Sequence, residues 1–398
     1  MISVQEALTI ILEHRKDFAV EQVPLDQAIG RLLREDLLAD RDFPPYNRVT
    51  MDGIAIRYED FERGQRHFAV QGTVAAGMPQ QTLQAADHCL EIMTGAILPE
   101  QADTIIRYED VEIKNGAARI TIDTVKARQN VHRKGSDREQ GARVVEAGML
   151  LSPAEVGVAA TIGKAQLAVS QLPSCLIIST GDELVGIDQQ PLPHQIRRSN
   201  VHRLQATLAK HHILADTAHL MDDLEEVTRR LEGFLGQYEV IILSGGVSKG
   251  KFDYIPEALA RLGVEKCFHR VAQRPGKPFW FGQAPNGTVV FALPGNPVSS
   301  FMCMQAYFLP WLRASLGLAP TPYPKALLKT PVTFRPDLVY FLQVAIEYDQ
   351  EGRIWARPVE GRGSGDLANL ADADAFLQLP QGRTAFNAGE VFPLIVYR

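Results

Sequence analysis

Residues 240–251 have the sequence VIILSGGVSKGK, and this stretch indicates an α/β protein. Val240–Leu243 is a short run of aliphatic residues, which predicts a buried strand. The loop that follows it, Ser244–Gly250, is rich in glycine, which predicts a tight turn. Free backbone N–H groups in such a turn can surround an anion, so the stretch is a candidate binding loop; a simple turn without a ligand is the alternative.

The segments around this stretch alternate between strands and helices. Apolar runs lie at 175–179, 214–220 and 288–293, and helical patterns lie at 200–212, 223–235 and 297–316. Strands that are separated by helices of about ten or more residues predict a largely parallel sheet with right-handed crossovers. We therefore expect a central, doubly wound, mostly parallel α/β domain.

The rest of the chain has a different pattern. Ser3–Glu6 and Ser152–Glu155 have the spacing of a capping box, so each predicts the start of a helix. Short β-like runs lie between them, at 68–74, 89–93, 104–108 and 118–122. Asn115-Gly116 predicts a tight hairpin within this β-rich module. Pro320, Pro322 and Pro324 predict a stiff linker, after which short strands return.

Length, composition and charge exclude several classes of protein. The 398 residues suggest two to four domains at roughly 150 residues each. A formal net charge of −6 argues against a general nucleic-acid binder. The longest apolar stretch, Phe301–Leu312, is shorter than the roughly 18 residues of a membrane span. The first residues do not resemble a signal peptide, and the four cysteines include no CxxC pair. We expect a cytoplasmic protein that binds neither nucleic acid nor membranes.

Polar residues follow each predicted parallel strand. In chain order they are Thr180-Gly181-Asp182-Glu183, Asp222-Asp223, the glycine loop with Asp253, and Pro294-Gly295-Asn296-Pro297. Ligands of open parallel sheets bind beyond the carboxyl ends of the strands, so we expect these loops to open on one edge. The glycine loop also matches GxxxxGK, but Phe252 stands where a Walker loop has the Ser or Thr that binds magnesium. A nucleoside-triphosphate-hydrolysing loop is therefore not expected.

Charged residues near these loops predict a site for an anion and a hard cation. Arg274 and Lys277 lie three residues apart in a proline-rich segment, and Lys249 and Lys251 are further candidates. Several carboxylates at strand ends favour oxygen ligation of a cation such as Mg²⁺, although any one of them taken singly is explained as a surface charge. The sequence shows no HExxH motif, Ser/His/Asp signature or catalytic-cysteine motif.

Six short segments resemble one known family. They are Met51-Asp52-Gly53, Met93-Thr94-Gly95-Ala96, STGDEL at 179–184, SGGVS at 244–248 with Asp253-Tyr254, Pro275-Gly276-Lys277-Pro278, and LPGNPV at 293–298. In their order and spacing the chain resembles the molybdopterin molybdenumtransferases, the molybdenum insertase family that includes MoeA and the E domain of gephyrin. The resemblance covers nearly the whole chain.

The resemblance implies a multidomain α/β and β fold in a homodimer. The α/β molybdopterin-binding domain would comprise residues 1–19 and 173–321, and a linking domain residues 20–41 and 140–172. An inserted β-rich domain would cover 42–139, and a β-barrel-like domain 322–398. The active cleft would lie between the α/β domain of one subunit and parts of the other.

The implied reaction converts adenylylated molybdopterin and molybdate into molybdenum cofactor and AMP, with Mg²⁺ required. Carried over by position, the catalytic residues would be Asp52, Thr94, Asp137 and Glu183, the first three from the partner subunit. Substrates would be bound by Thr180, Gly181, Asp182, Gly245, Gly246, Val247, Ser248, Asp253, Arg274, Lys277, Pro294, Asn296 and Pro297. Glu183, Asp253 and Asp222 would bind the metal. Molybdopterin adenylyltransferase and apo-molybdoenzymes are candidate partners under this resemblance.

Three departures from the family pattern, and two other functions, stay open. Val49-Thr50 and Ile54 flank Met51–Gly53 where the family usually has Ser-Ala and an aromatic residue, and Arg274 stands where Lys is common. Gln343 stands where an Arg is usual; Arg335, Arg357 or Arg362 could supply that charge. The alternatives are a molybdopterin adenylyltransferase and a non-catalytic, gephyrin-like scaffold. The preference for molybdate or tungstate also stays open.

Overall fold

The computed structural model describes residues 1–247, 253–361, 363 and 365–398, and the chain divides into two compact units. The first unit comprises residues 1–22, 30–34 and 168–398, and the second comprises residues 23–29 and 35–167. The four domain boundaries given above stay a prediction. Among the helices of the described residues, none has both the length and the apolar character that crossing a bilayer requires.

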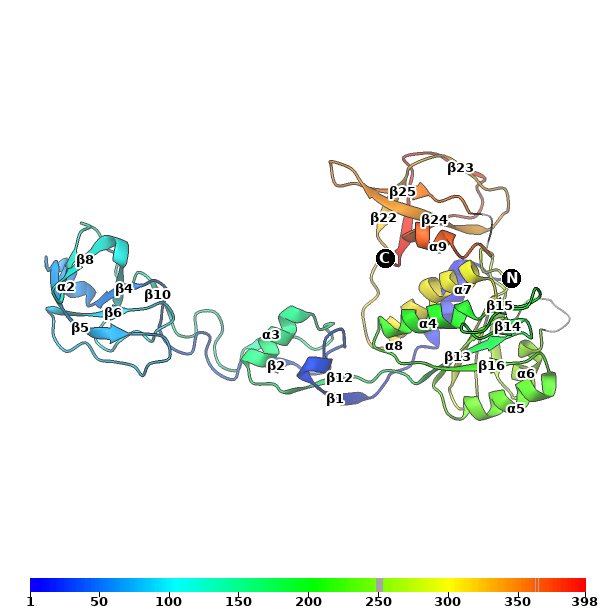
Figure 1. The fold of residues 1–398 in the computed structure, drawn as a ribbon, viewed down its shortest axis with the longest axis horizontal. Helices are drawn as coiled ribbons and strands as arrows, with labels where there is room; N and C mark the ends of the chain where they lie inside the picture. Colours follow the sequence, from blue (N-terminus) through cyan, green and yellow to red (C-terminus); the bar gives the residue numbers. More distant parts are fainter. Residues whose placement is uncertain (248–252, 362, 364) are drawn as a thin grey trace. The chain divides into compact units, whose positions relative to one another are not determined.

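An α/β sheet forms the centre of the first unit (Figure 1), with strand order β16-β13-β17-β21-β20-β18. Its strands are β13 (Cys175–Thr180), β16 (Asp216–Leu220), β17 (Val240–Ser244), β18 (Glu265–His269), β20 (Trp280–Gln283) and β21 (Val289–Leu293). β16, β13, β17 and β21 are parallel, as predicted, whereas β20 and β18 are antiparallel. The sequence pattern did not reveal this antiparallel edge, where no helix separates β18 from β20.

Helices cover both faces of this sheet, which confirms the doubly wound architecture. They are α1 (Val4–Glu13), α4 (Ser199–Ala209), α5 (Leu224–Leu235), α6 (Ile255–Arg261), α7 (Pro297–Cys303) and α8 (Leu309–Ser315). Alternate residues of each strand face opposite sides. Ile177 and Ile242 join one core with α1, α4, α7 and α8, while Ile178 and Leu243 join another with α5 and α6. The long helix predicted over 297–316 is continuous but contains a π-helical turn, η3 (Met304–Phe308).

The C-terminal part of the first unit is a closed barrel, which confirms the barrel-like prediction. β22 (Lys325–Leu328), β24 (Val339–Tyr348), β25 (Ile354–Pro358), β26 (Ala375–Leu379) and β28 (Val391–Val396) close on one another through the β24–β26 pairing. β19 (Gln273–Arg274) joins this sheet beside β24. The remaining short elements are β14 (Leu184–Val185), β15 (Ile196–Arg197), β23 (Val332–Thr333), β27 (Ala385–Phe386) and α9 (Asn369–Asp372).

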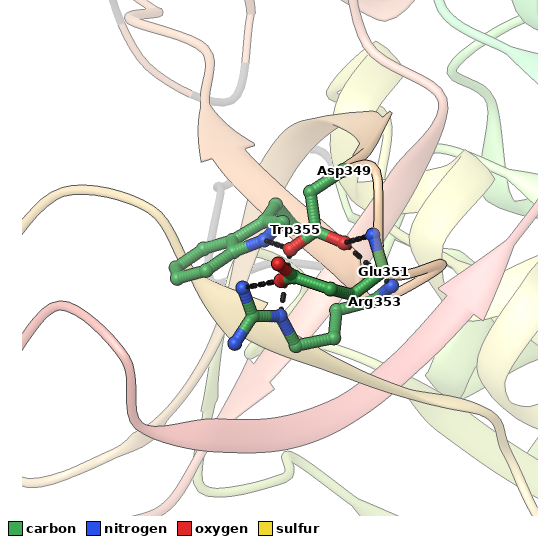
Figure 2. Close-up of polar contacts among 4 residues, drawn as sticks. All are labelled: Asp349, Glu351, Arg353 and Trp355. Carbon is green, nitrogen blue, oxygen red and sulfur yellow. Dashed lines mark hydrogen bonds and ion pairs between the residues drawn. The ribbon is translucent and has the colours of Figure 1, made fainter.

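The turn between β24 and β25 is held by a network of hydrogen bonds and ion pairs (Figure 2). Asp349 Oδ2 accepts from Trp355 Nε1 at 2.8 Å and from Arg353 Nε at 2.7 Å. Its Oδ1 accepts from the backbone N–H groups of Glu351 and Arg353. Every oxygen of this carboxylate therefore has donors, which fixes the turn.

The second unit contains the predicted β-rich module. Its mixed sheet has strand order β7-β4-β6-β5-β9-β8. The strands are β4 (Gly53–Ile56), β5 (His67–Val74), β6 (His88–Ile92), β7 (Thr104–Arg107), β8 (Val111–Lys114) and β9 (Ala117–Ile120). Asn115 and Gly116 have positive φ values of 50° and 75°, so the predicted tight hairpin joins β8 to β9.

Short helices and ladders complete the second unit. They are α2 (Tyr58–Glu62), η2 (Tyr108–Asp110), η1 (Leu25–Gln27), α3 (Pro153–Thr161), β3 (Arg48–Val49) with β10 (Val131–His132), and β2 (Leu37–Leu38) with β11 (Arg143–Val145). β1 (Val20–Pro24) pairs with β12 (Gln166–Ser170), and each of these two strands has residues in both units. The capping boxes predicted at Ser3 and Ser152 are both present, at the starts of α1 and α3.

Candidate active site

The loops after the parallel strands open on one edge of the sheet, as expected. Thr180 is in register with Leu220, and Ser244 with both Ser179 and Leu293, so the carboxyl ends of these strands coincide. Their loops line a cavity of about 480 Å³, which we call the glycine-loop cavity. The predicted residues that line it are Thr180, Gly181, Glu183, Asp222, Gly245, Gly246, Val247, Asp253, Pro294, Asn296 and Pro297. Ser248, Lys249 and Lys251 lie outside the described residues.

Two glycines let the glycine loop approach the neighbouring strand closely. Gly245 and Gly246 have φ values of +110° and +70°, which L side chains rarely adopt. A Cβ at Gly245 would also lie 2.7 Å from Thr180 Oγ1, and one at Gly246 would lie 2.7 Å from Ile255 Cγ1. The backbone therefore forms this wall of the cavity itself, which leaves room for an anion against it.

The carboxylates at this edge have separate roles in the structure. Glu183, Asp222 and Asp253 line the cavity. Asp182 does not; its Oδ1 accepts from the Asp222 backbone N–H at 2.9 Å, so it holds the next loop. Asp223 caps α5 by accepting from Glu226 N at 2.8 Å. Burial, and then the charges of Asp182, Glu183 and Asp253, raise the pKa of Asp222.

A second cavity, of about 620 Å³, adjoins the first, and we call it the cationic cavity. It shares Pro278, Pro294 and Asn296 with the glycine-loop cavity. Arg274 and Lys277 line it, no Asp or Glu does, and neither cation forms an ion pair within the described part of the chain. Its charge therefore suits an anionic ligand.

Buried polar contacts fix the segment that carries these cations. Gln273 Nε2 donates to Gly276 O at 3.0 Å, and Gln273 Oε1 accepts from the buried Tyr307 hydroxyl. The Arg274 guanidinium lies 5.9 Å from the centroid of the Phe334 ring, which is stacked on Tyr340. Rigid support of this kind keeps the two cations in place without neutralising them.

Gln343 lines the cationic cavity from β24 and has an unused donor. Its Oε1 accepts from Asn369 Nδ2 at 3.2 Å, while its Nε2 is buried without a partner among the described residues. Arg335 and Arg357 do not line the cavity, and Arg357 is paired with Glu347. Arg362 lies outside the described residues.

The three predicted residues of the second unit form two separate contacts there. Asp52 Oδ1 accepts from Thr94 N at 2.6 Å and from Thr94 Oγ1 at 2.8 Å, and these bonds lower the pKa of Asp52. Asp137 Oδ1 instead contacts His132 Nε2 at 2.8 Å. The structure thus brings Asp52 and Thr94 together in a hydrogen-bonded pair.

Sequence reasoning missed several residues that line the cavities. Arg197 from β15, Arg198 at the N-cap of α4 and Asn200 in its first turn line the glycine-loop cavity. Tyr340 and Phe341 line the cationic cavity from the barrel. The polar stretch at 197–200, immediately before a helical pattern, was a usable signal for the first group. The barrel residues carried none, because their contribution depends on long-range packing.

Comparison with known proteins identifies the family. A protein from Synechocystis named molybdopterin molybdenumtransferase is 42% identical over 404 residues, covering 100% of both chains. The chain belongs to the molybdopterin molybdenumtransferase family. A molybdopterin molybdenumtransferase from Synechococcus elongatus is 32% identical, covering 98% of each chain. Two crystal structures of MoeA proteins from Pyrococcus horikoshii are 28% and 25% identical to this chain, and each has a TM-score of 0.84. Both matches cover 100% of this chain; they cover 99% of the first crystal structure's chain and 100% of the second's.

Three sequence profiles match successive parts of the chain. The MoeA N-terminal region (domain I and II) matches residues 2–163, and the MoeA C-terminal region (domain IV) matches residues 325–397. A profile described as "Probable molybdopterin binding domain" matches residues 176–314, which contain the glycine loop. The two MoeA profiles therefore flank the molybdopterin-binding profile, in the order of the α/β and β segments of the fold.

Proposed function

We propose that this chain transfers molybdenum from molybdate to adenylylated molybdopterin and releases AMP, in the biosynthesis of molybdenum cofactor. The observation that carries the proposal is the pair of adjoining cavities. One is walled by a glycine-rich backbone loop and carboxylates, and the other holds two cations, Arg274 and Lys277, that form no ion pair with any described residue. Full-length relatives named molybdopterin molybdenumtransferase support the same reaction.

Each of the two cavities binds one of the two anionic reactants. The glycine-loop cavity binds the phosphates of adenylylated molybdopterin through backbone N–H groups of residues 245–247 and the loops around Thr180 and Asn296. The cationic cavity binds molybdate through Arg274 and Lys277, and Gln343 offers a neutral donor. Because the cavities share Pro278, Pro294 and Asn296, the two reactants are held side by side. Fixed cations and dipoles offset the repulsion between them, which is catalysis by positioning and electrostatics.

The carboxylates of the glycine-loop cavity fit a magnesium ion that is shared with substrate. Glu183, Asp222 and Asp253 are hard oxygen donors, and a cation would offset the burial and the carboxylate repulsion that raise the pKa of Asp222. Within the described residues, no group of three or more His, Cys, Asp or Glu could hold a metal alone. Mg²⁺ commonly takes one or two carboxylates plus substrate phosphates and water, so these residues suit it. When bound, Mg²⁺ neutralises phosphate charge.

Residues of the second unit complete the proposed site in a homodimer. Asp52, which Thr94 holds in its ionised form, and Asp137 would close the active cleft of the partner subunit. The protein acts in the cytoplasm in this proposal. Molybdopterin adenylyltransferase would supply its substrate, and apo-molybdoenzymes would receive its product.

A reconstituted reaction tests the function directly. Purified chain is supplied with adenylylated molybdopterin, molybdate and Mg²⁺, and AMP and molybdenum cofactor are measured. We expect both products to form, chelation of Mg²⁺ with EDTA to stop the reaction, and Glu183→Ala to reduce it strongly. A folded Glu183→Ala protein that is as active as the parent would contradict the site assignment.

The same assay separates the two alternatives. A molybdopterin adenylyltransferase would consume ATP and molybdopterin, so each substrate pair is offered separately. A scaffold would form no AMP with either pair and would be indifferent to molybdate. Failure of the parent chain to release AMP from adenylylated molybdopterin would refute the proposed function.

A further inference from the structure

Asn200 connects two loops of the glycine-loop cavity. It lies in the first turn of α4 and lines the cavity. Its Nδ2 donates to Ser244 Oγ at 2.9 Å and to Gly295 O at 2.7 Å. Ser244 ends β17 where the glycine loop begins, and Gly295 lies in the loop after β21. One amide group therefore sets the spacing between two neighbouring loops.

Arg203, one turn further along α4, fixes the orientation of this amide. Its Nη2 donates to Asn200 Oδ1 at 2.8 Å, to Pro297 O at 2.8 Å and to Ser300 Oγ at 3.2 Å. Because the guanidinium can only donate, Asn200 must present its oxygen to Arg203 and its nitrogen to the loops. The same side chain also holds the start of α7, which follows the Pro294–Pro297 loop.

The buried charge of Arg203 is unfavourable for the stability of the fold. Burial lowers the pKa of Arg203 to about 10, and its Nε and Nη1 are buried without partners among the described residues. Unpaired buried donors are unfavourable, and an apolar side chain could fill the same space between α4 and Phe301. A feature that costs stability beside a binding cavity is more readily explained by function than by folding.

We propose that Asn200 is a positioning residue for the reaction and that Arg203 acts through it. Together they hold the glycine loop and the Pro294–Pro297 loop at the separation that the phosphates of the nucleotide–pterin substrate require. This inference rests on the proposed function and names residues that neither the sequence motifs nor the binding loops contain. Neither side chain needs to take part in bond making or breaking.

Asn200→Ala and Arg203→Met test the pair. Asn200→Ala removes the bridge, and Arg203→Met keeps the apolar stem but removes the donors. Since a misplacement of about 1 Å can cost about 100-fold in rate, we expect each variant to lower kcat/KM for AMP release by about 10- to 100-fold. The AMP dissociation constant, measured by calorimetry, should rise about tenfold. The molybdate KM should change less, because Gln273 rather than Asn200 holds the segment with Arg274 and Lys277.

Two further variants and one control separate positioning from folding. Arg203→Lys, which retains one donor, should recover part of the activity that Arg203→Met loses. The double variant should be no worse than the worse single variant, because the residues act as a unit. Gln205→Met is the control: Gln205 lies on the same helix and donates to Ala215 O at 3.0 Å, but lines neither cavity. It should keep the kinetic constants and AMP affinity of the parent.

The outcomes distinguish this inference from the function on which it rests. If the parent releases no AMP, the proposed function is wrong, and the AMP affinities of the variants still decide the role of the loops. If both variants keep the parent's AMP affinity and kcat, the inference is wrong. It is equally wrong if their losses merely follow a lowered Tm and Gln205→Met loses activity to the same extent. A variant that fails to fold is replaced by Arg203→Lys and Asn200→Ser, to which the same criteria apply.

Discussion

The β24–β25 turn and the glycine-loop cavity both contain several carboxylates, but the pKa of a carboxylate is lowered in the turn and raised in the cavity. In the turn, hydrogen bonds from Trp355 and Arg353 hold the pKa of Asp349 well below its usual range (Figure 2). In the cavity, burial and like charges raise the pKa of Asp222. Charge in the turn is paired and stabilises the fold, whereas like charges lie close together in the cavity, an arrangement that is typical of functional sites.

The cationic cavity extends the contrast to positive charge. Arg353 in the turn is paired with Asp349 and Glu351. Arg274 and Lys277 form no ion pair within the described residues, and the Gln343 Nε2 has no partner there. Regions whose polar groups are satisfied hold the fold together, and regions whose groups are not satisfied mark where a ligand completes them.

The largest expected effect is that of Asp222→Asn. The substitution removes an oxygen donor that faces the proposed phosphate and magnesium site, so kcat for AMP release should fall by about 100-fold or more. Thermal stability should not fall, because the change also removes repulsion from Asp182, Glu183 and Asp253. Activity and Tm are measured on the same preparation.

The adjacent Asp223→Asn is the matched control for that prediction. Asp223 caps α5, and Asn caps a helix about as well as Asp, so both activity and Tm should stay at the parent's values. If Asp222→Asn kept full activity, or lost stability together with activity, the contrast between the cavity and the turn would no longer hold.

A smaller effect is expected for Lys277→Met in the cationic cavity. A hydrogen bond to a charged group contributes about 1.5–3 kcal/mol, so the molybdate KM should rise about tenfold or more. The KM for adenylylated molybdopterin should change less, and Tm little. Lys325→Met, which removes an exposed lysine from the barrel, controls for the change in net charge. Equal effects of the two substitutions would mean that the cavity does not bind molybdate.

Local sequence patterns predicted most of the fold because the signals were local. The capping boxes at Ser3 and Ser152, the Asn115-Gly116 hairpin and the alternation of strands and helices after Pro173 all appear in the structure. The antiparallel edge formed by β18 and β20 was missed. Strand direction there depends on the connection between the strands, for which residue composition gives no signal.

In the candidate site, too, features with a local sequence signal could be predicted and features that depend on long-range contacts could not. Loops after parallel strands could be predicted together because the topology forces their carboxyl ends to coincide. The role of Asp182 in binding stays a prediction; in the structure its side chain accepts from the Asp222 backbone N–H. The polar stretch at 197–200 was a signal for Asn200, but its bridge to Ser244 and Gly295 could not be predicted, because it joins residues far apart in the chain. The same holds for the barrel's contribution to the cationic cavity.

Gln343→Arg adds a third cation to the cationic cavity and so increases its difference in charge from the β24–β25 turn. We expect the molybdate KM to fall a few-fold, because the guanidinium adds a charge-assisted donor in place of an amide that has no partner among the described residues. The change also removes the acceptor for Asn369, so Tm should fall slightly. Gln378→Arg on the adjacent strand β26 lines no part of the cavity and should leave KM unchanged. An unchanged KM in both variants would argue against Gln343 as a ligand.

The smallest effect on activity is expected for Asp349→Asn in the β24–β25 turn. Kinetic constants should equal those of the parent, because the turn lines neither cavity. Tm at neutral pH should fall, because Asn places an NH₂ group or a weaker acceptor opposite the donors of Trp355 and Arg353. Glu351→Gln is the control: Glu351 is 70% exposed, and loss of a surface ion pair should change Tm by about one degree or less.

The pH dependence of that Tm difference tests its electrostatic origin. A carboxyl whose folded-state pKa lies below its unfolded-state value contributes stability above the unfolded pKa of about 3.9, and loses it as the pH falls through the folded pKa. The Tm of the parent should therefore exceed that of Asp349→Asn by a constant amount between about pH 5 and pH 8, and the two should converge below about pH 4. A difference that persisted unchanged at low pH would show that Asp349 acts through its shape alone. Charge in the turn would then not be the stabilising counterpart of the like charges gathered in the glycine-loop cavity.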